Sequence, residues 1–288
     1  MRWSSAGSEM SRTLSSDRHR WMVSGDPLQR WLPIVVILLM LIPGCESGSA
    51  RQQLTVFAAS SLTDVLPVLK AEFERTRPDT ELQLVFGGSQ ILRLQIEQGA
   101  MADLFISAHP EHVQSLIDQG ILADPEPVVE NPLVVIIAPD QASSITRFEQ
   151  LSEIKRLVVG DAAVPLGSYT EEVIQKADAV MGSGFAEQLR SSVVSKESNS
   201  RLVRSKVLLG EADAAFVYKS DARNTAVGIV ELPEPLSTRA RYVLATREVG
   251  DGDLARQFRV FLGSDRAMQI FREHEFPILE GMGASLEK

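Results

Sequence analysis

The chain has 288 residues, of which 44% are hydrophobic and 23% are charged, which is ordinary globular composition with length for one large domain or two smaller ones. Its formal net charge of −9 argues against a nucleic-acid partner and against an electrostatic grip on anionic lipid. The single cysteine, Cys45, cannot form an intramolecular disulfide. We therefore expect a globular fold that is stabilised by its own hydrophobic core.

The first part of the chain has the order of a secretory signal, in which basic residues precede a short apolar run, Trp31–Pro43. This run is too short to span a bilayer comfortably. The sequence Ile42-Pro43-Gly44-Cys45 resembles a bacterial lipobox, in which the cysteine is lipid-modified and becomes the first mature residue. Pro43 departs from that motif, and an uncleaved membrane anchor is the alternative. We expect a signal peptide over 1–44, a lipid anchor on Cys45, a tether over 45–53, and an extracytoplasmic location for the rest.

From Leu54 onward, the chain alternates between strand and helix patterns. Strands are predicted at 54–58, 81–86, 102–107, 133–138, 157–159, 214–218 and 241–246. Helices are predicted at 62–73, 91–98, 113–117, 169–180, 200–209, 253–261 and 266–274. Pro67 conflicts with the first helix because proline removes a backbone donor. This alternation predicts an α/β fold with parallel sheets.

Several predicted strands end directly in serine- or glycine-bearing helix starts, the place where ligands bind in open α/β sheets. These junctions are 58–61, 86–89, 160–168 and 198–200. Taken singly, each has a local explanation: Ser61-Leu62-Thr63-Asp64 is close to a capping box, and Ser89 could cap the next helix. Taken together, they would gather helix N-termini, whose free N–H groups and partial positive charge attract anions.

The first two junctions, FAASSL and FGGSQ, contain no lysine or arginine. An anion held there would be bound by dipoles and hydroxyls. Removal of 1–44 leaves 24 basic and 35 acidic residues, a net charge of −11, which by itself would disfavour an anion. Distant charges are screened within about 8–10 Å. The turns offer few acceptors besides Asp64 and Asp161, so a protonated anion such as hydrogen phosphate would lose about 1–3 kcal/mol. The pattern therefore favours molybdate, tungstate or sulfate.

Other chemistry finds little support in the sequence. His109 and His112 resemble a metal pair, but Pro110 indicates a helix start and no third ligand is evident. The chain lacks a G-x-S-x-G elbow and a phosphate-binding G-x-x-x-x-G-K-[ST] loop. We expect neither an enzyme nor a cofactor.

Six motifs in order resemble the periplasmic molybdate-binding proteins of ABC importers, over about residues 54–278. They are VFAASSLTDVL, FGGSQILRLQIEQGAMADLFISA, NPLVVIIAP, VVGDAAVPLGSYTEEVI, GEADAAFVYKSDA and IFREHEF. The resemblance implies two Rossmann-like α/β lobes joined by two crossover strands, for which the apolar runs at 133–138 and 241–246 are suited. Lobe 1 would then comprise 54–132 plus 236–288, and lobe 2 would comprise 133–235.

The resemblance also implies which positions contact the oxyanion. Ser61, Ser89 and Tyr218 would donate hydroxyls, and Leu166 and Ser200 would donate backbone N–H groups. Gly87-Gly88 replaces a turn richer in serine or alanine, Leu166 stands where alanine is common, and Ser200 stands where valine is common. Leu166 could crowd the pocket, and the Ser200 hydroxyl could blur discrimination between oxyanions.

The function implied by the resemblance is capture of molybdate, and also tungstate, by a lipid-anchored monomer. The protein would deliver the anion to a membrane permease driven by a separate ATPase. The alternatives are a binding protein for another tetrahedral oxyanion such as sulfate, a sensory lobe feeding a membrane receptor, and an extracytoplasmic enzyme on the same scaffold.

Overall fold

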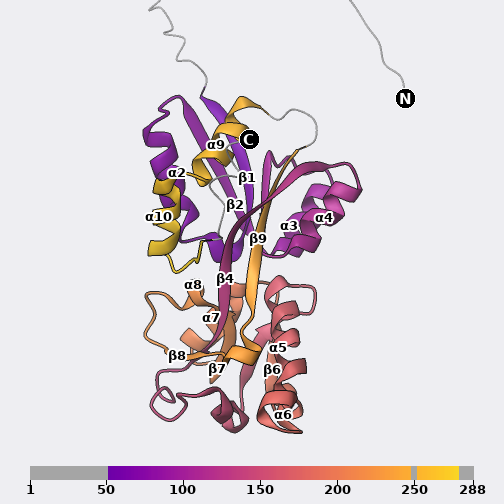
Figure 1. Cartoon of the computed structure of the whole chain (residues 1–288), viewed down its shortest axis with the longest axis vertical. Helices are drawn as coiled ribbons and strands as arrows, with labels where there is room; N and C mark the ends of the chain where they lie inside the picture. Colours follow the sequence, from indigo (N-terminus) through magenta and orange to yellow (C-terminus); the bar gives the residue numbers. More distant parts are fainter. Residues whose placement is uncertain (1–50, 248–251, 279–288) are drawn as a thin grey trace, which may run out of the picture. The chain divides into compact units, whose positions relative to one another are not determined.

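The structure is a computed structural model that describes residues 51–247 and 252–278, all within the compact unit Ser49–Lys288 (Figure 1). The predicted signal peptide, Cys45 and most of the predicted tether lie outside the described residues. Within the described ranges, every helix is too short or too polar to cross a membrane. The body consists of two α/β lobes joined by two long strands, which confirms the predicted fold class.

Lobe 1 is built on three parallel strands in the order β2-β1-β3. The strands are β1 (Gln52–Ala59), β2 (Thr80–Gly87) and β3 (Leu104–Ser107). A 3₁₀ turn, η1 (Ser60–Leu62), follows β1. The helices of this lobe are α2 (Leu66–Arg75), α3 (Ser89–Glu97), α4 (Pro110–Asp118), α9 (Asp253–Leu262) and α10 (Asp265–Glu273). Among its core contacts, the rings of Phe73 and Phe258 meet edge to face at 5.1 Å.

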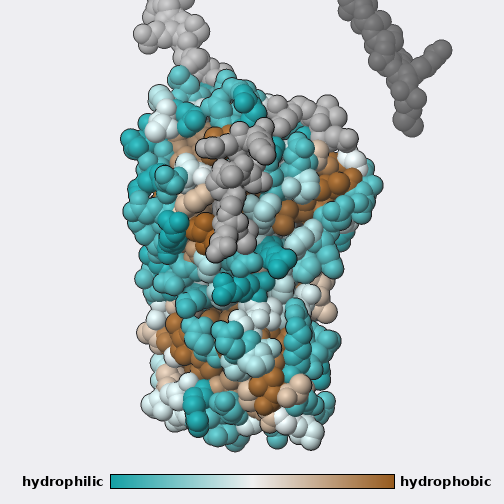
Figure 2. Space-filling model, viewed as in Figure 1, coloured by the Kyte–Doolittle hydropathy of each residue, from teal (hydrophilic) through white to brown (hydrophobic). Residues whose placement is uncertain are grey.

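Lobe 2 is built on strands β5 (Leu157–Gly160), β6 (Val193–Glu197), β7 (Ala214–Tyr218) and β8 (Gly228–Glu231). Its helices are α5 (Pro165–Met181), α6 (Phe185–Ser191), α7 (Ser200–Leu208) and α8 (Lys219–Ala222), with 3₁₀ turns η2 (Phe148–Glu153) and η3 (Glu234–Leu236). In both lobes the apolar faces of helices and strands are buried, and hydrophilic residues cover much of the face shown in Figure 2.

The two lobes are joined by the antiparallel strands β4 (Leu122–Ile137) and β9 (Arg239–Arg247), which run side by side from one lobe to the other in Figure 1. β4 pairs with β9 up to Pro132 and with β7 from Leu133 onward. Since the strand changes partner there, we propose that the lobes divide near Pro132 and again near Pro235, as the sequence predicts. The order β2-β1-β3-β9-β4-β7-β5-β6 thus forms one continuous sheet path.

The helix starts differ from the sequence prediction at two places that matter for function. The first predicted helix is split: η1 follows β1 and α2 begins only at Leu66, which leaves Pro67 in the first turn where a missing N–H costs nothing. The predicted capping box at Ser61 is wrong, because no side chain caps η1. The helix predicted from Tyr169 begins at Pro165, so most of the predicted loop is the first turn of α5. The elements α6, β6, α8 and β8 were not predicted.

The early start of α5 requires a glycine. A β-carbon at Gly167 would lie 2.0 Å from the carbonyl oxygen of Asp161, at the end of the β5 loop. The first turn of α5 can therefore approach the end of β5 only because residue 167 has no side chain. This approach brings the backbone of Leu166 to the interface between the lobes.

We predict that Gly167→Ala lowers the free energy of unfolding by about 1–3 kcal/mol, because the methyl group overlaps backbone that cannot move without displacing β5. Gly87→Ala is the matched control. Its methyl would meet Leu92 Cδ2 at 3.1 Å, and that side chain can shift, so we expect a smaller loss. Urea unfolding of both variants measures the difference, and equal losses would contradict the explanation.

Candidate functional site

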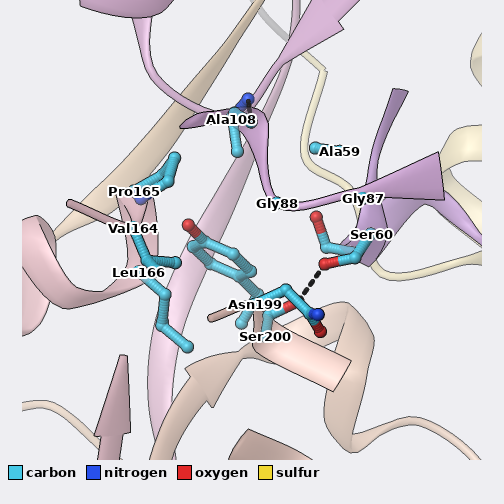
Figure 3. A pocket seen from close by; sticks show the side chains of 13 residues that line it. Ala59, Ser60, Gly87, Gly88, Ala108, Val164, Pro165, Leu166, Asn199 and Ser200 are labelled. Atoms are coloured by element: carbon cyan, nitrogen blue, oxygen red, sulfur yellow. Dashed lines mark hydrogen bonds between the residues drawn. The ribbon is translucent and has the colours of Figure 1, made fainter. Parts of the chain in front are cut away.

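A small polar cavity lies where the helix starts of the two lobes face each other (Figure 3). Its volume of about 10 Å³ is room for one water molecule. Lobe 1 contributes Ala59, Ser60, Ser61, Gly87, Gly88, Ser89 and Ala108, and lobe 2 contributes Val164, Pro165, Leu166, Asn199, Ser200 and Tyr218. In the described part of the chain, none of these lining residues carries a carboxylate, ammonium or guanidinium group.

Ser89 presents its hydroxyl from the first turn of α3, where it is 1% exposed. Its Oγ accepts a hydrogen bond from the backbone N–H of Ala108 at 3.1 Å. Because that bond uses a lone pair of the oxygen, the hydroxyl hydrogen stays available for a guest. Ser89 does not cap α3, as the sequence had allowed, because the N-cap is Gly88 and no side chain bonds there.

Ser61 is oriented by a chain of buried hydrogen bonds from the crossover strands. Its Oγ lies 2.6 Å from the Tyr242 hydroxyl on β9, and that hydroxyl accepts from Asn131 Nδ2 on β4 at 3.3 Å. Asn131 also donates to Ser220 Oγ at 2.8 Å. Burial raises the pKa of Tyr242, so its hydroxyl keeps its proton and can donate to Ser61. Ser61 is then free to donate onward into the cavity.

Two helix N-termini supply backbone donors from lobe 2. Leu166 lies in the first turn of α5, after the N-cap Val164, and Ser200 begins α7 after the N-cap Asn199. The N–H groups of a first turn have no partner within the helix and carry the positive end of its dipole. The Asn199 side chain accepts from Leu202 N at 3.0 Å and so fixes the start of α7.

Leu166, which the sequence suggested could crowd the pocket, is one of the residues that line the cavity. It is 0% exposed and packs in the main hydrophobic core. Its γ-branched chain therefore serves the core of lobe 2, while its backbone faces the cavity. The Ser200 hydroxyl does reach the cavity, as expected.

Tyr218 carries a buried hydroxyl without a partner. The residue ends β7 and is 2% exposed, and its oxygen has no hydrogen-bond partner among residues 51–247 and 252–278. Burial raises the pKa of Tyr218 well above its ordinary value, so the group is a permanent donor. A buried hydroxyl without a partner costs about 1–3 kcal/mol, which a ligand oxygen would relieve.

The lobes touch each other around the cavity. Ser60 Oγ on lobe 1 lies 3.2 Å from Ser200 Oγ on lobe 2, as the dashed line in Figure 3 shows. Beside this pair, Gln90 Nε2 donates to the carbonyl oxygen of Ser198 at 2.7 Å. A β-carbon on Gly88 would lie 2.5 Å from that same carbonyl, so glycine permits the approach. A guest larger than one water would need more room than this cavity offers.

The structure thus gathers all five predicted positions, Ser61, Ser89, Leu166, Ser200 and Tyr218, around one cavity. Ser60 was not among the predicted contacts, but it begins η1 and lines the cavity. The sequence analysis also missed Asn131 and Tyr242, whose hydrogen bonds orient Ser61. Ser60 could have been predicted from its position next to Ser61. The roles of Asn131 and Tyr242 depend on strand pairing, which a single sequence does not reveal.

The histidine pair set aside earlier lies at the start of α4. His109 Nδ1 accepts from Glu111 N at 3.2 Å and caps that helix, and the ring of His109 packs against Tyr169 at 5.0 Å. Burial lowers the pKa of His112 to about 4, which keeps its ring neutral near pH 7. Within the described residues, no group of three or more His, Cys, Asp or Glu side chains is placed to hold a metal ion.

A two-lobed α/β fold with a small polar cavity between the lobes defines the class of bilobal solute-binding proteins. The model of the family described as bacterial extracellular solute-binding protein matches residues 54–276. This chain therefore belongs to that family.

Individual relatives carry more specific names. The putative ABC transporter substrate-binding lipoprotein YvgL of Bacillus subtilis is 30% identical over 249 residues, covering 82% of this chain and 93% of the relative. The molybdate-binding protein ModA of Escherichia coli is 31% identical over 242 residues, covering 78% and 89%.

Solved structures show the same fold. The substrate-binding domain of a putative molybdenum ABC transporter from Clostridium difficile is 30% identical, with a TM-score of 0.63 and coverage of 79% of this chain and 99% of that one. The sulfate-binding protein SubI from Mycobacterium tuberculosis is only 15% identical, with a TM-score of 0.65 and coverage of 81% and 89%, and shows the fold alone.

We predict opposite effects for the two buried tyrosines in the ligand-free protein. Tyr218→Phe should leave the free energy of unfolding unchanged or raise it, because the lost hydroxyl has no partner. Tyr242→Phe should lower it by about 1–3 kcal/mol, since bonds to Ser61 and Asn131 are lost. Chemical unfolding without ligand compares them, and an equal loss for Tyr218→Phe would contradict the unpartnered hydroxyl.

Proposed function

We propose that this protein captures molybdate, and also tungstate, outside the cytoplasm and delivers it to an ABC importer. The observation that carries the proposal is the buried Tyr218 hydroxyl, which has no hydrogen-bond partner among the described residues. It lies in a cavity lined by hydrogen-bond donors from both lobes, and none of the lining residues is formally charged. The relatives named as molybdate-binding, at about 30% identity, support the choice of anion.

The donor set is suited to a tetrahedral dianion. Hydroxyls of Ser61, Ser89 and Tyr218 and the N–H groups of Leu166 and Ser200 approach from both lobes, so a central anion can accept from several directions. Solvent exclusion strengthens each of these bonds. A ligand that retains a proton would need an acceptor at the same place, which favours anions that are fully deprotonated near pH 7.

Selectivity among dianions depends on the hydroxyl pair Ser60 and Ser200. A serine hydroxyl can rotate to donate in different directions, so this pair can follow a dianion of different size. Sulfate is therefore the alternative ligand, and the fold of SubI is compatible with it. A sensory lobe is a further alternative, and no contact in the described residues favours it over transport.

The mechanism is capture followed by closure. The open lobes admit the anion, the five donors replace its water shell, and the lobes close by motion about β4 and β9. A ligand drives this change only through its preference for the closed state.

The closed form would be presented to a permease that is powered by a separate ATPase. The binding protein would be a monomer held at the membrane by lipidated Cys45. The name of the YvgL relative supports the lipid anchor. We assign no catalysis and no cofactor to this chain.

We predict saturable binding of molybdate and tungstate, weaker binding of sulfate, and none of phosphate at matched concentration. Isothermal titration calorimetry of the full chain in detergent measures all four anions. Tight sulfate binding without molybdate binding would overturn the assignment and favour the alternative.

The same titration on variants tests the site. Ser89→Ala and Tyr218→Phe should each weaken molybdate binding by about 1–3 kcal/mol, because a bond to a charged partner is lost. Ser152→Ala is the control, since this exposed serine of η2 bonds only locally, to the carbonyl oxygen of Glu149. Unchanged affinity in both site variants would remove these residues from the site.

A further inference from the structure

Arg201 joins the two lobes behind the cavity. It lies in the first turn of α7 on lobe 2, and its guanidinium reaches η1 on lobe 1. Nε donates to the carbonyl oxygen of Ser60 at 3.2 Å, and Nη2 donates to that of Ser61 at 3.4 Å. Nη2 also lies 2.9 Å from Asp64 Oδ2. One side chain of lobe 2 therefore contacts three residues of lobe 1, Ser60, Ser61 and Asp64.

The contacts of Arg201 fall on the two residues whose hydroxyls line the cavity. Ser60 and Ser61 turn their side chains toward the cavity and offer their carbonyl oxygens to the guanidinium. Arg201 itself is not among the described residues that line the cavity, and its side chain is 17% exposed. Its guanidinium group therefore contacts backbone carbonyl oxygens and does not face the cavity.

The surrounding charges keep Arg201 in place. Asp221, which is 0% exposed, lies 3.1 Å from Arg201 Nε as an ion pair without hydrogen-bonding alignment. Burial raises the pKa of Asp221, and the guanidinium of Arg201 opposes that rise. Arg204 also approaches this residue, donating to its carbonyl oxygen at 3.3 Å. Two arginines and the carboxyl groups of Asp64 and Asp221 therefore form one cluster behind η1.

We propose that Arg201 is a positioning residue that latches lobe 2 onto the Ser60–Asp64 segment of lobe 1 and so holds the lobes closed around the bound anion. The proposal deepens the proposed function, on which it rests. The latch belongs to the closed state and makes no contact with the ligand. It therefore changes how long the closed complex lasts and leaves the choice of anion to the cavity donors.

Because the latch forms only when the lobes close, its loss should change the dissociation rate constant and not the association rate constant. An anion meets the open protein before the latch can form, so loss of the latch should leave the association rate unchanged. The closed complex should open sooner, so the dissociation rate should rise by the factor that the latch contributed to closure. The ratio of molybdate to sulfate affinity should stay constant, because the cavity donors and the Ser60–Ser200 hydroxyl pair keep their side chains.

Two variants of the full chain test the latch. Arg201→Met removes every latch contact, and we expect molybdate to dissociate about tenfold faster or more. That variant also leaves the buried Asp221 without its cation and can fail to fold. Asp64→Asn therefore decides the question, because Asp64 is 48% exposed and Arg201 remains in place. For Asp64→Asn we expect dissociation about two- to fivefold faster, the range for a partly exposed ion pair.

The control is Glu231→Gln, which breaks the 2.9 Å ion pair with Lys219 inside lobe 2 and should leave both rate constants unchanged. Stopped-flow fluorescence in detergent gives the rates, thermal unfolding of the ligand-free variants reports stability, and hydrogen exchange of 60–64 in the bound state reports opening. Faster dissociation and exchange in Asp64→Asn, at unchanged ligand-free stability and selectivity, is the expected result.

A wild-type dissociation rate in Asp64→Asn would overturn the latch, as would an altered molybdate-to-sulfate ratio. Failure of the proposed function looks different, because the wild type would then prefer sulfate, and the same rate comparison would be made with sulfate. Absence of binding of molybdate, tungstate, sulfate and phosphate by the wild type would overturn both proposals.

Discussion

The proposed function depends on one constraint, which is that a dianion in this cavity would be compensated by partial charges alone. The cavity offers hydroxyls and helix N-termini, and each must already point inward, because a donor that has to turn or exchange partners loses much of its advantage. Ser89 is held by Ala108 N, Ser61 by Tyr242, and the N–H groups of Leu166 and Ser200 by their helices. The Tyr218 hydroxyl is the donor whose partner is missing without a guest.

The crossover strands connect this donor set to the joint between the lobes. Asn131 on β4 and Tyr242 on β9 orient Ser61, so the strands that join the lobes also orient one of the proposed ligand contacts. On the other side of η1, Arg201 donates hydrogen bonds to the carbonyl oxygens of Ser60 and Ser61. The 3₁₀ turn after β1 is therefore fixed from two directions, by uncharged groups on its hydroxyl side and by a cation on its carbonyl side.

The sequence predicted much of this arrangement and missed the parts that depend on contacts between distant residues. Apolar periodicity located the strands and most helices, and the resemblance placed Ser61, Ser89, Leu166, Ser200 and Tyr218, which the structure gathers around one cavity. The start of α5 was misplaced because the proline of an apparent loop is also favoured at the first helical position. Tyr242 and Arg201 carried no local signal, since their roles arise only when β9 and α7 approach η1.

The most direct test of the account is a crystal structure of the protein with molybdate. The account predicts the anion between the lobes, with its oxygens within hydrogen-bonding distance of the Ser61, Ser89 and Tyr218 hydroxyls and of the Leu166 and Ser200 N–H groups. The Ser60–Ser200 contact would be separated, and Arg201 would remain on the backbone of η1. Density for the anion elsewhere, or an anion held mainly by lysine or arginine side chains, would contradict it.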